Sequence, residues 1–256
     1  MYNKLFLILF IISILCILLF SNIYELFYST NKIVIFYHIC ELGNWKDVVK
    51  EQLDLIKYTG LYDKTESINI GFLGDKKNIL PYLNDKIKLV YTSENKKEHE
   101  IPTINKINEF SKNTNDEYYI LYIHSKGVTN LGGNEKDYNG QHYWRKFMNY
   151  WNITKHQICI DQLNKGYYTV GINCFENHYS GNFWWANSKY IKNLNYLKHK
   201  DDAGLQAEFW LLSKKEQKKS ICLTKKNYNS LRRNLSGLYS IKIQPKDYGK
   251  LNIRIL

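Results

Sequence analysis

The sequence predicts a single α/β domain with a mostly parallel central sheet flanked by helices, preceded by an amino-terminal transmembrane helix. Strand-like apolar runs alternate with helical patterns through the first half of the chain. The apolar content of 44% and the aromatic content of 15% are sufficient for a packed core. We therefore divide the 256 residues into an anchor with a short linker (1–30), a domain (31–215) and a carboxyl-terminal extension of unknown role (216–256).

The anchor is predicted from the apolar run between Leu5 and Phe20, which only Ser13 interrupts. The run is slightly shorter than the ~20 residues that span a bilayer, but apolar residues after it can extend it at the interface. A cleaved signal peptide is the alternative, although no small-x-small cleavage site follows the run. We expect a single-pass membrane protein whose soluble domain is lumenal or extracytoplasmic.

Charge and cysteine content narrow the possible partners. The net charge of +12 is compatible with nucleic acid, an anionic membrane surface or phosphate-bearing substrates. The lysines are dispersed and no nucleic-acid-binding motif is present, so we expect no nucleic-acid partner. Outside the anchor the cysteines are Cys40, Cys159, Cys174 and Cys222, which form no CxxC pair and do not predict structural zinc. Disulfides and buried free thiols both remain open.

The expected elements follow in order from residue 32. A strand over Lys32–Cys40 has an apolar run that ends at His38, and a helix over Trp45–Tyr58 keeps helical spacing until a stop at Gly60. The elements predicted after them are a strand over Ser67–Gly74, a short helix over Asn78–Leu83 interrupted by Pro81, a strand over Ile87–Tyr91, a loop over Thr92–Glu100 and a helix from Pro102 through Phe110.

The central strand is predicted from Tyr118 to His124, because its composition is typical of a strand that is buried on both faces. Ser125, Lys126 and Gly127 follow it. A lysine, an imidazole and a glycine at the carboxyl end of a parallel strand suit a phosphate group. A solvated strand end is the alternative interpretation.

Two other predicted strands end at candidate ligand groups, His38 and Gly74, so these should lie at the same edge of the sheet as His124. No GxGxxG and no GxxxxGK[ST] occurs in the chain, which argues against dinucleotide oxidoreductases and P-loop enzymes.

The second half adds a helix around Arg145, a strand over Tyr167–Cys174 and the string HYSGNFWWANSKYI. This string contains Gly181, Asn182, Trp184 and Trp185. Aromatic faces beside amides are typical of a sugar-binding site, whereas the alternative is that Trp184 and Trp185 are alternating core and rim residues of a strand.

A final helix, AGLQAEFWLLS, places Glu208 among apolar neighbours. A carboxylate in such surroundings is a candidate general base, with Asp201 and Asp202 in reserve. A structural role inside the helix is the alternative for Glu208.

The strings ILYIHSKGVT, YWRKFMNYW, VGIN, HYSGNFWWANSKYI and AEFW together resemble a family of nucleotide-sugar-dependent glycosyltransferases with the GT-A fold. The group occurs in bacteria and large DNA viruses and is related to rhamnan-synthesis proteins, and the resemblance covers residues 38–212. It implies a single GT-A (Rossmann-like) domain that transfers a hexosyl or deoxyhexosyl group from a nucleoside-diphosphate donor to a hydroxyl of a glycan or glycoconjugate. A membrane-tethered module that binds sugar nucleotides or glycans without catalysis is the alternative.

The resemblance also implies roles for the residues singled out above. The expected donor-binding residues are His38, Gly74, His124, Lys126, Gly127 and Arg145. The expected sugar- or acceptor-binding residues are Gly181, Asn182, Trp184 and Trp185, and the expected catalytic residues are Glu208 and Asp202. His-Ser-Lys stands where many GT-A enzymes have a metal-binding Asp-x-Asp, so no cofactor is certain, although Mn²⁺ or Mg²⁺ is possible. We expect Lys126, His124 and Arg145 to stabilise the diphosphate directly.

Overall fold

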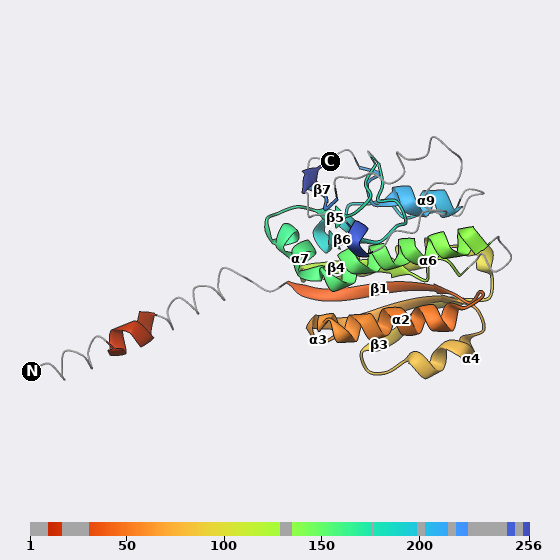
Figure 1. Cartoon of the computed structure of the whole chain (residues 1–256), viewed down its shortest axis with the longest axis horizontal. Helices are drawn as coiled ribbons and strands as arrows, with labels where there is room; N and C mark the ends of the chain where they lie inside the picture. Colours follow the sequence, from red (N-terminus) through yellow and green to blue (C-terminus); the bar gives the residue numbers. More distant parts are fainter. Residues whose placement is uncertain are drawn as a thin grey trace, which may run out of the picture. The chain divides into compact units, whose positions relative to one another are not determined.

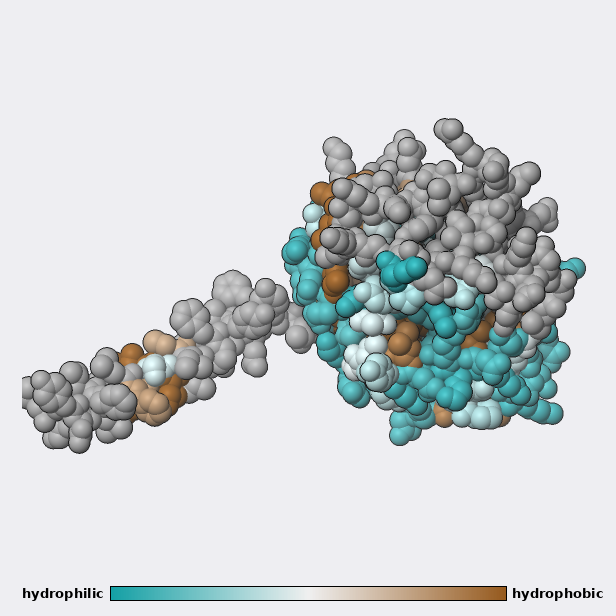
Figure 2. Space-filling model, in the orientation of Figure 1, coloured by the Kyte–Doolittle hydropathy of each residue, from teal (hydrophilic) through white to brown (hydrophobic). Residues whose placement is uncertain are grey.

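The structure, a computed structural model, describes residues 10–16, 31–128, 135–175, 177–198, 203–214, 219–224, 245–248 and 253–256. It divides the chain into two units, Met1–Asn31 and Lys32–Leu256. In the first unit, residues 10–16 are helical and expose apolar side chains, brown in Figure 2. Among the described residues no helix is both long and apolar enough to cross a membrane. The rest of the predicted anchor lies outside the described residues.

The second unit contains one eight-stranded sheet in the order β3-β2-β1-β4-β6-β5-β7-β8 (Figure 1). Its parallel half comprises β3 (Ile87–Ser93), β2 (Thr65–Leu73), β1 (Lys32–Cys40) and β4 (Tyr118–His124). Because β1 and β4 lie at the centre, their side chains are buried on both faces, as the apolar runs predict.

The mixed half of the sheet comprises β6 (Trp184–Asn187), β5 (Thr169–Gly171), β7 (Ser220–Cys222) and β8 (Arg254–Ile255). Strand β6 is antiparallel to both β4 and β5, β7 is parallel to β5, and β8 is antiparallel to β7. The prediction of an α/β domain with a mostly parallel sheet flanked by helices is confirmed.

Helices cover both faces of the sheet. One face packs against α2 (Trp45–Tyr58), α6 (Glu135–Asn149) and α7 (His156–Asn164). The other face packs against α5 (Ile101–Asn113), α8 (Ser188–Ile191) and α9 (Ala203–Trp210). The short helices are α3 (Leu61–Lys64), α4 (Lys76–Ile79), η1 (Leu80–Tyr82), η2 (Lys96–Glu98), the π-helical turn η3 (Tyr150–Thr154) and η7 (Pro245–Asp247).

The bounds predicted for β1 and α2 are confirmed, and α2 is followed by Gly60 in the left-handed conformation, with φ of 71°. The strand predicted over Tyr167–Cys174 is wrong in length, because β5 spans only Thr169–Gly171. Asn173 has φ of 50°, which turns the chain out of the sheet, and Cys174 makes only an isolated bridge with Tyr179. Strands β7 and β8 show that the described parts of residues 216–256 belong to the same folded unit as the domain.

Helix α5 packs very closely on β2 at Gly71. A Cβ atom at Gly71 would lie 1.9 Å from Oγ1 of Thr103, so only glycine fits against this threonine. The hydroxyl of Thr103 is in turn 2.8 Å from Nδ1 of His38. The glycine therefore lets α5 supply a hydrogen-bond partner to a histidine on β1.

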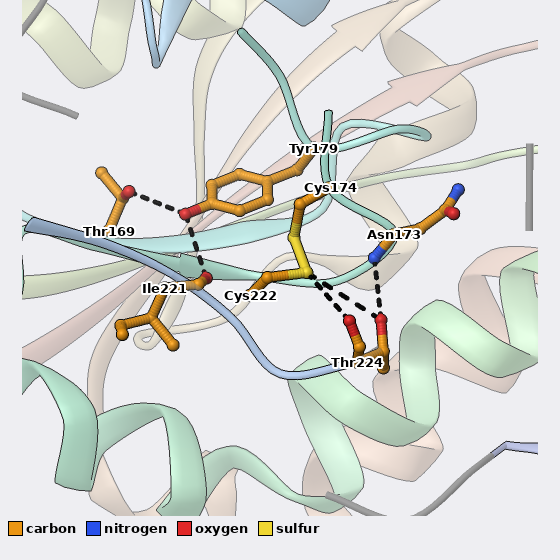
Figure 3. The surroundings of a disulfide bond; sticks show 7 residues. All are labelled: Thr169, Asn173, Cys174, Tyr179, Ile221, Cys222 and Thr224. Carbon is orange, nitrogen blue, oxygen red and sulfur yellow. Dashed lines mark hydrogen bonds between the residues drawn. A yellow bond between two sulfur atoms is a disulfide. The ribbon is translucent and has the colours of Figure 1, made fainter. Parts of the chain in front are cut away.

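A disulfide joins Cys174, after β5, to Cys222 in β7 (Figure 3). Beside it the hydroxyl of Tyr179 donates to the carbonyl of Ile221 at 3.1 Å and lies 2.8 Å from the hydroxyl of Thr169. The sequence left disulfides and free thiols open, and the structure pairs these two cysteines. Cys40 and Cys159 are free.

Candidate functional site

A cavity of about 310 Å³ lies where strands β1, β2 and β4 end. His38 on β1 and His124 on β4 are register partners in the parallel pair, so their side chains enter the cavity together. The lining residues are His38, Cys40, Leu42, Leu73, Lys96, His99, Glu100, His124, Ser125, Lys126, Gly127, Val128 and Gln141. The sheet therefore places a mixture of imidazoles, lysines and one carboxylate at its carboxyl edge, where open α/β sheets bind ligands.

Four of the predicted donor-binding residues line this cavity: His38, His124, Lys126 and Gly127. The turn after β4 holds the last two. Gly127 has φ of 89°, which favours glycine, and a Cβ atom there would lie 3.2 Å from the side chain of Gln141. The ammonium of Lys126 lies 4.4 Å from the ring centroid of Trp144, in a cation–π contact. The turn thus brings Lys126 to the cavity, with its ammonium against the ring of Trp144.

Gly74 does not line the cavity. Its backbone N–H donates to the carbonyl of Ser93 at 2.8 Å, and a Cβ atom at this position would lie 2.3 Å from Oε2 of Glu41. The carboxylate of Glu41 also accepts the N–H of Asp75 at 2.7 Å. Gly74 therefore has a structural role in the turn after β2.

Arg145 also lies outside the cavity lining. Its guanidinium donates to both carboxylate oxygens of Glu51, at 3.2 and 3.1 Å, and to the carbonyl of Lys126 at 2.8 Å. Its side chain is only 4% exposed. We expected Arg145 to contact a diphosphate, but its guanidinium is paired with Glu51 instead. Its contribution to the site is to hold the backbone of Lys126 in place.

Arg145 belongs to a support network that we define as Glu51, Gln52, Arg145 and Asn149, on α2 and α6. The amide of Asn149 donates to Glu51 at 3.2 Å and accepts from Gln52 at 3.0 Å. Gln52 accepts the hydroxyl of Tyr37, on β1, at 2.6 Å. This chain of hydrogen bonds joins the turn that carries Lys126 to helices α2 and α6 and to the central strand β1.

Glu100 is the functional residue that sequence reasoning missed. It directly precedes α5 and is the only carboxylate among the described residues that line the cavity. Its Oε2 accepts the hydroxyl of Tyr122 at 2.8 Å and the amide of Asn182 at 2.6 Å. The sequence assigned Glu100 to a loop. The only signal was its place just before the Ile101-Pro102 helix start, where acidic residues are favoured by the helix dipole.

The two central imidazoles are held in hydrogen bonds. His124 donates from Nε2 to the carbonyl of Gly181 at 2.9 Å, and His38 contacts Thr103 through Nδ1. Burial lowers the pKa of His38 to about 4, although Glu100 opposes this shift. Burial also lowers the pKa of His124, again against the effect of Glu100. Both rings are therefore neutral at pH 7.

The pKa of Glu100 is shifted by opposing effects. Burial alone raises it, but the electrostatic effects of the neighbouring His124, His38 and Lys126 side chains and the hydrogen bond from Tyr122 together hold the pKa below its usual range. Glu100 is consequently a carboxylate at pH 7, so the cavity has one negative group opposite Lys96 and Lys126.

The string around Gly181 connects the cavity to α9. The N–H of Gly181 donates to Oε1 of Glu208 at 2.7 Å, while its carbonyl accepts from His124. Glu208 is half-buried and does not line the cavity. Asp201 and Asp202 lie outside the described residues.

Trp184 and Trp185 do not offer ring faces to a sugar. They are 1% and 0% exposed, and their indole N–H groups donate to Asn182 and to the carbonyl of Asn152, each at 2.9 Å. The expectation of sugar-binding tryptophans is corrected, because β6 is an inner strand of the sheet and both of its faces are covered. Asn182 contributes to the site indirectly, through Glu100.

The described residues contain no group of three or more histidine, cysteine, aspartate or glutamate side chains arranged to hold a metal ion. The cations that face the cavity are those of Lys96 and Lys126. Any charge of a bound diphosphate would be met by these lysines.

A family model described only as a domain of unknown function (DUF8361) matches residues 27–232, which is most of the chain. The protein therefore belongs to this family. No curated protein matches the sequence.

Proposed function

We propose that the protein is a nucleotide-sugar-dependent glycosyltransferase that moves a hexosyl or deoxyhexosyl group to a hydroxyl of a glycan or glycoconjugate. The observation that carries this proposal is the cavity at the carboxyl ends of β1, β2 and β4, where two lysines, three imidazoles and one carboxylate converge. Cations suit a diphosphate, and a carboxylate suits the hydroxyl groups of a sugar. The sequence resemblance described above adds the reaction class.

The strand order supports a GT-A fold for this domain. The parallel series β3-β2-β1-β4 is followed by the antiparallel strand β6, and the ligand cavity lies beside the turn after β4. In many GT-A enzymes this turn carries the groups that hold the donor diphosphate, and here it carries His124, Ser125 and Lys126.

In the proposed reaction the acceptor hydroxyl oxygen attacks the anomeric carbon of the donor sugar. A bond forms between these two atoms, and the bond from the anomeric carbon to the diphosphate oxygen breaks with its electron pair on the diphosphate. Lys96 and Lys126 stabilise that developing charge. A carboxylate takes the acceptor proton, and Glu208 is our proposed base because it accepts the N–H of Gly181, whose carbonyl in turn accepts from His124 in the cavity lining. Glu208→Gln should slow transfer roughly 10²- to 10⁴-fold while donor binding is retained.

We further propose that the domain acts on the extracytoplasmic side of a membrane, tethered by residues 1–30. The disulfide between Cys174 and Cys222 supports an oxidising compartment, because disulfides persist there and are rare in the cytosol of most organisms. Alkylation of thiols before and after reduction, on protein taken directly from its native membrane, tests whether this disulfide is formed.

A donor screen tests the activity. The full chain in detergent is incubated with a panel of nucleotide sugars and several glycan acceptors, with and without EDTA, and release of nucleoside diphosphate is followed. We expect release from one donor, retained in EDTA and lost in Lys126→Ala, with Lys192→Ala as the control because Lys192 is an exposed lysine outside the cavity. Donor binding without release under all conditions would instead favour a sugar-nucleotide-binding module.

A further inference from the structure

Two hydrogen-bond acceptors lie close together in the cavity lining. Nδ1 of His124 and Oε1 of Glu100 lie 3.8 Å apart, which is too far for a hydrogen bond between them. Both residues line the cavity, and the side chain of Glu100 is 19% exposed. The question is what satisfies these two atoms.

The proton of His124 lies on its other nitrogen. Nε2 is 2.9 Å from the carbonyl oxygen of Gly181, and a carbonyl can only accept, so Nε2 carries the hydrogen. In the neutral ring Nδ1 then has a lone pair and no proton. The ring is neutral at pH 7 because burial lowers its pKa. Nδ1 therefore presents an acceptor to the cavity.

Of the two carboxylate oxygens of Glu100, one is hydrogen-bonded within the described part of the protein and the other is not. Oε2 accepts from Tyr122 and from Asn182, and both partners are fixed, since the amide oxygen of Asn182 is itself bonded to the indole of Trp184. Oε1 makes no hydrogen bond to any residue that the structure describes. A carboxylate oxygen and an imidazole lone pair thus converge on one point without a donor between them.

A group that binds at this point must donate a hydrogen bond and must not be an anion. The diphosphate of a nucleotide sugar is esterified at both ends, so it has no proton to donate at neutral pH and would be repelled by the carboxylate. A hydroxyl group donates a hydrogen and is neutral. Lys96 and Lys126, which also line the cavity, favour an anion. The cavity therefore offers both cations and hydrogen-bond acceptors.

We propose that Oε1 of Glu100 and Nδ1 of His124 form a subsite for a hydroxyl group of the bound nucleotide sugar, beside the lysines that bind its diphosphate. This inference rests on the function proposed above and specifies which part of the donor Glu100 and His124 recognise. The hydroxyl belongs either to the ribose or to the transferred sugar. The two sources share the same chemistry.

Glu100→Gln is a selective probe of this subsite. The glutamine oxygen must take the place of Oε2, because Tyr122 and Asn182 both donate there, so its NH₂ group takes the place of Oε1. The substitution replaces the acceptor Oε1 by a donor and removes one negative charge, while Nδ1 of His124 is unchanged. A hydroxyl-bearing ligand should bind about 10- to 100-fold more weakly, whereas inorganic pyrophosphate should bind as tightly or more tightly.

The experiment is calorimetric titration of the full chain in detergent with inorganic pyrophosphate, a nucleoside diphosphate and the corresponding nucleotide sugar. Glu94→Gln is the matched control, because Glu94 is an exposed glutamate outside the cavity. Weaker binding of both organic ligands to Glu100→Gln would assign the hydroxyl to the ribose. Weaker binding of the nucleotide sugar alone would assign it to the transferred sugar.

A second variant covers the case in which Glu100→Gln does not fold. In His124→Gln the side-chain NH₂ can still donate to the carbonyl of Gly181, while the acceptor at Nδ1 is lost. Donor analogues in which one hydroxyl is replaced by fluorine test the wild-type protein directly, because fluorine cannot donate. One such analogue should bind about 10-fold or more weakly.

Each negative outcome has a distinct meaning. Equal affinity of the wild-type protein and Glu100→Gln for the nucleotide sugar overturns the subsite and leaves the proposed function standing. An equal loss of pyrophosphate binding also overturns it, because the effect would then not depend on a hydroxyl. Absence of binding of every probe to the wild-type protein overturns both. A doubly protonated His124 ring in the ¹⁵N spectrum of the free protein at pH 7 would overturn the subsite too.

Discussion

The two halves of the sheet satisfy their polar groups in opposite ways. The mixed half, β6-β5-β7-β8, is closed: its disulfide, its two buried tryptophans and the hydroxyl of Tyr179 all have partners within the protein. The parallel half ends in a cavity lined by two lysines and by two acceptors that have no hydrogen-bond donor among the described residues. The cavity is therefore marked by the charged and polar groups that line it rather than by an unusual composition.

The support network lies on the side of the parallel half, yet it resembles the mixed half in being fully bonded. Arg145 is as buried as a core residue and is paired with Glu51, whereas Lys126, only a turn away from the end of β4, faces the cavity. Two cations that look equivalent in the sequence thus have different roles, one structural and one available to ligand. The following predictions test this contrast.

Removal of the disulfide should have the largest effect on stability. The bond closes a loop with a sequence separation of 48, so Cys174→Ala/Cys222→Ala should lower the free energy of unfolding by about 4 kcal/mol. Urea unfolding measures this loss. A reductant should lower the midpoint of the wild-type protein but not that of the double variant. An unchanged wild-type midpoint in reductant would mean that the mixed half does not depend on the bond.

Acid should destabilise the parallel half through His38. Its pKa is about 4 in the folded protein and 6.5 as the ordinary value, so the unfolded chain binds the proton first as the pH falls. The free energy of unfolding should therefore decrease by about 3 kcal/mol between pH 6.5 and pH 4. The lowered pKa values of His124 and Glu100 act in the same direction. Urea unfolding across this range should show a shallower slope for His38→Gln, and an identical slope would contradict the assignment.

Arg145→Met should cost about 2 kcal/mol, less than the ~3–5 kcal/mol for a fully buried pair, because the side chain of Glu51 is 29% exposed. The loss arises from leaving the carboxylate of Glu51 unpaired. Glu51→Gln/Arg145→Met should therefore lose less stability than the sum of the two single variants, as measured by urea unfolding. Strict additivity would show that the support network is not a unit.

Lys126→Ala should have the smallest effect on stability and a clear effect on binding. We expect its urea midpoint to match that of the wild-type protein, and its affinity for inorganic pyrophosphate to fall about 10-fold. Added salt should reduce the difference between the two proteins. Lys192→Ala is the control for charge. A loss of stability equal to that of Arg145→Met would place Lys126 among the structural cations.

The sequence predicted much of the parallel half, because its elements follow from local pattern. The bounds of β1 and α2 could be read from apolar spacing, and the four cavity residues from strands that end in polar groups. Glu100 could not be found in this way, since its partners Tyr122 and Asn182 are 22 and 82 residues away.

Tertiary contacts also decided the roles of other predicted residues. The pairing of Arg145 with Glu51, 94 residues away, is not visible in the sequence. Nor is the burial of Trp184 and Trp185, which depends on β6 lying between two other strands. The tail after residue 215 had no strand pattern strong enough to predict β7 and β8. In each case the local sequence shows which residue is present, but not which distant residues it contacts in the folded protein.

The close contact between Gly71 and Thr103 has an evolutionary consequence. Any side chain at position 71 would overlap the threonine, and the Cβ of residue 103 would itself be only 2.9 Å from a Cβ at 71. Homologues that keep the hydrogen bond between positions 38 and 103 should therefore keep glycine at 71. Where a lineage has lost that glycine, positions 38 and 103 should have changed with it. This coupled substitution pattern would be visible in an alignment of the family before any member is assayed.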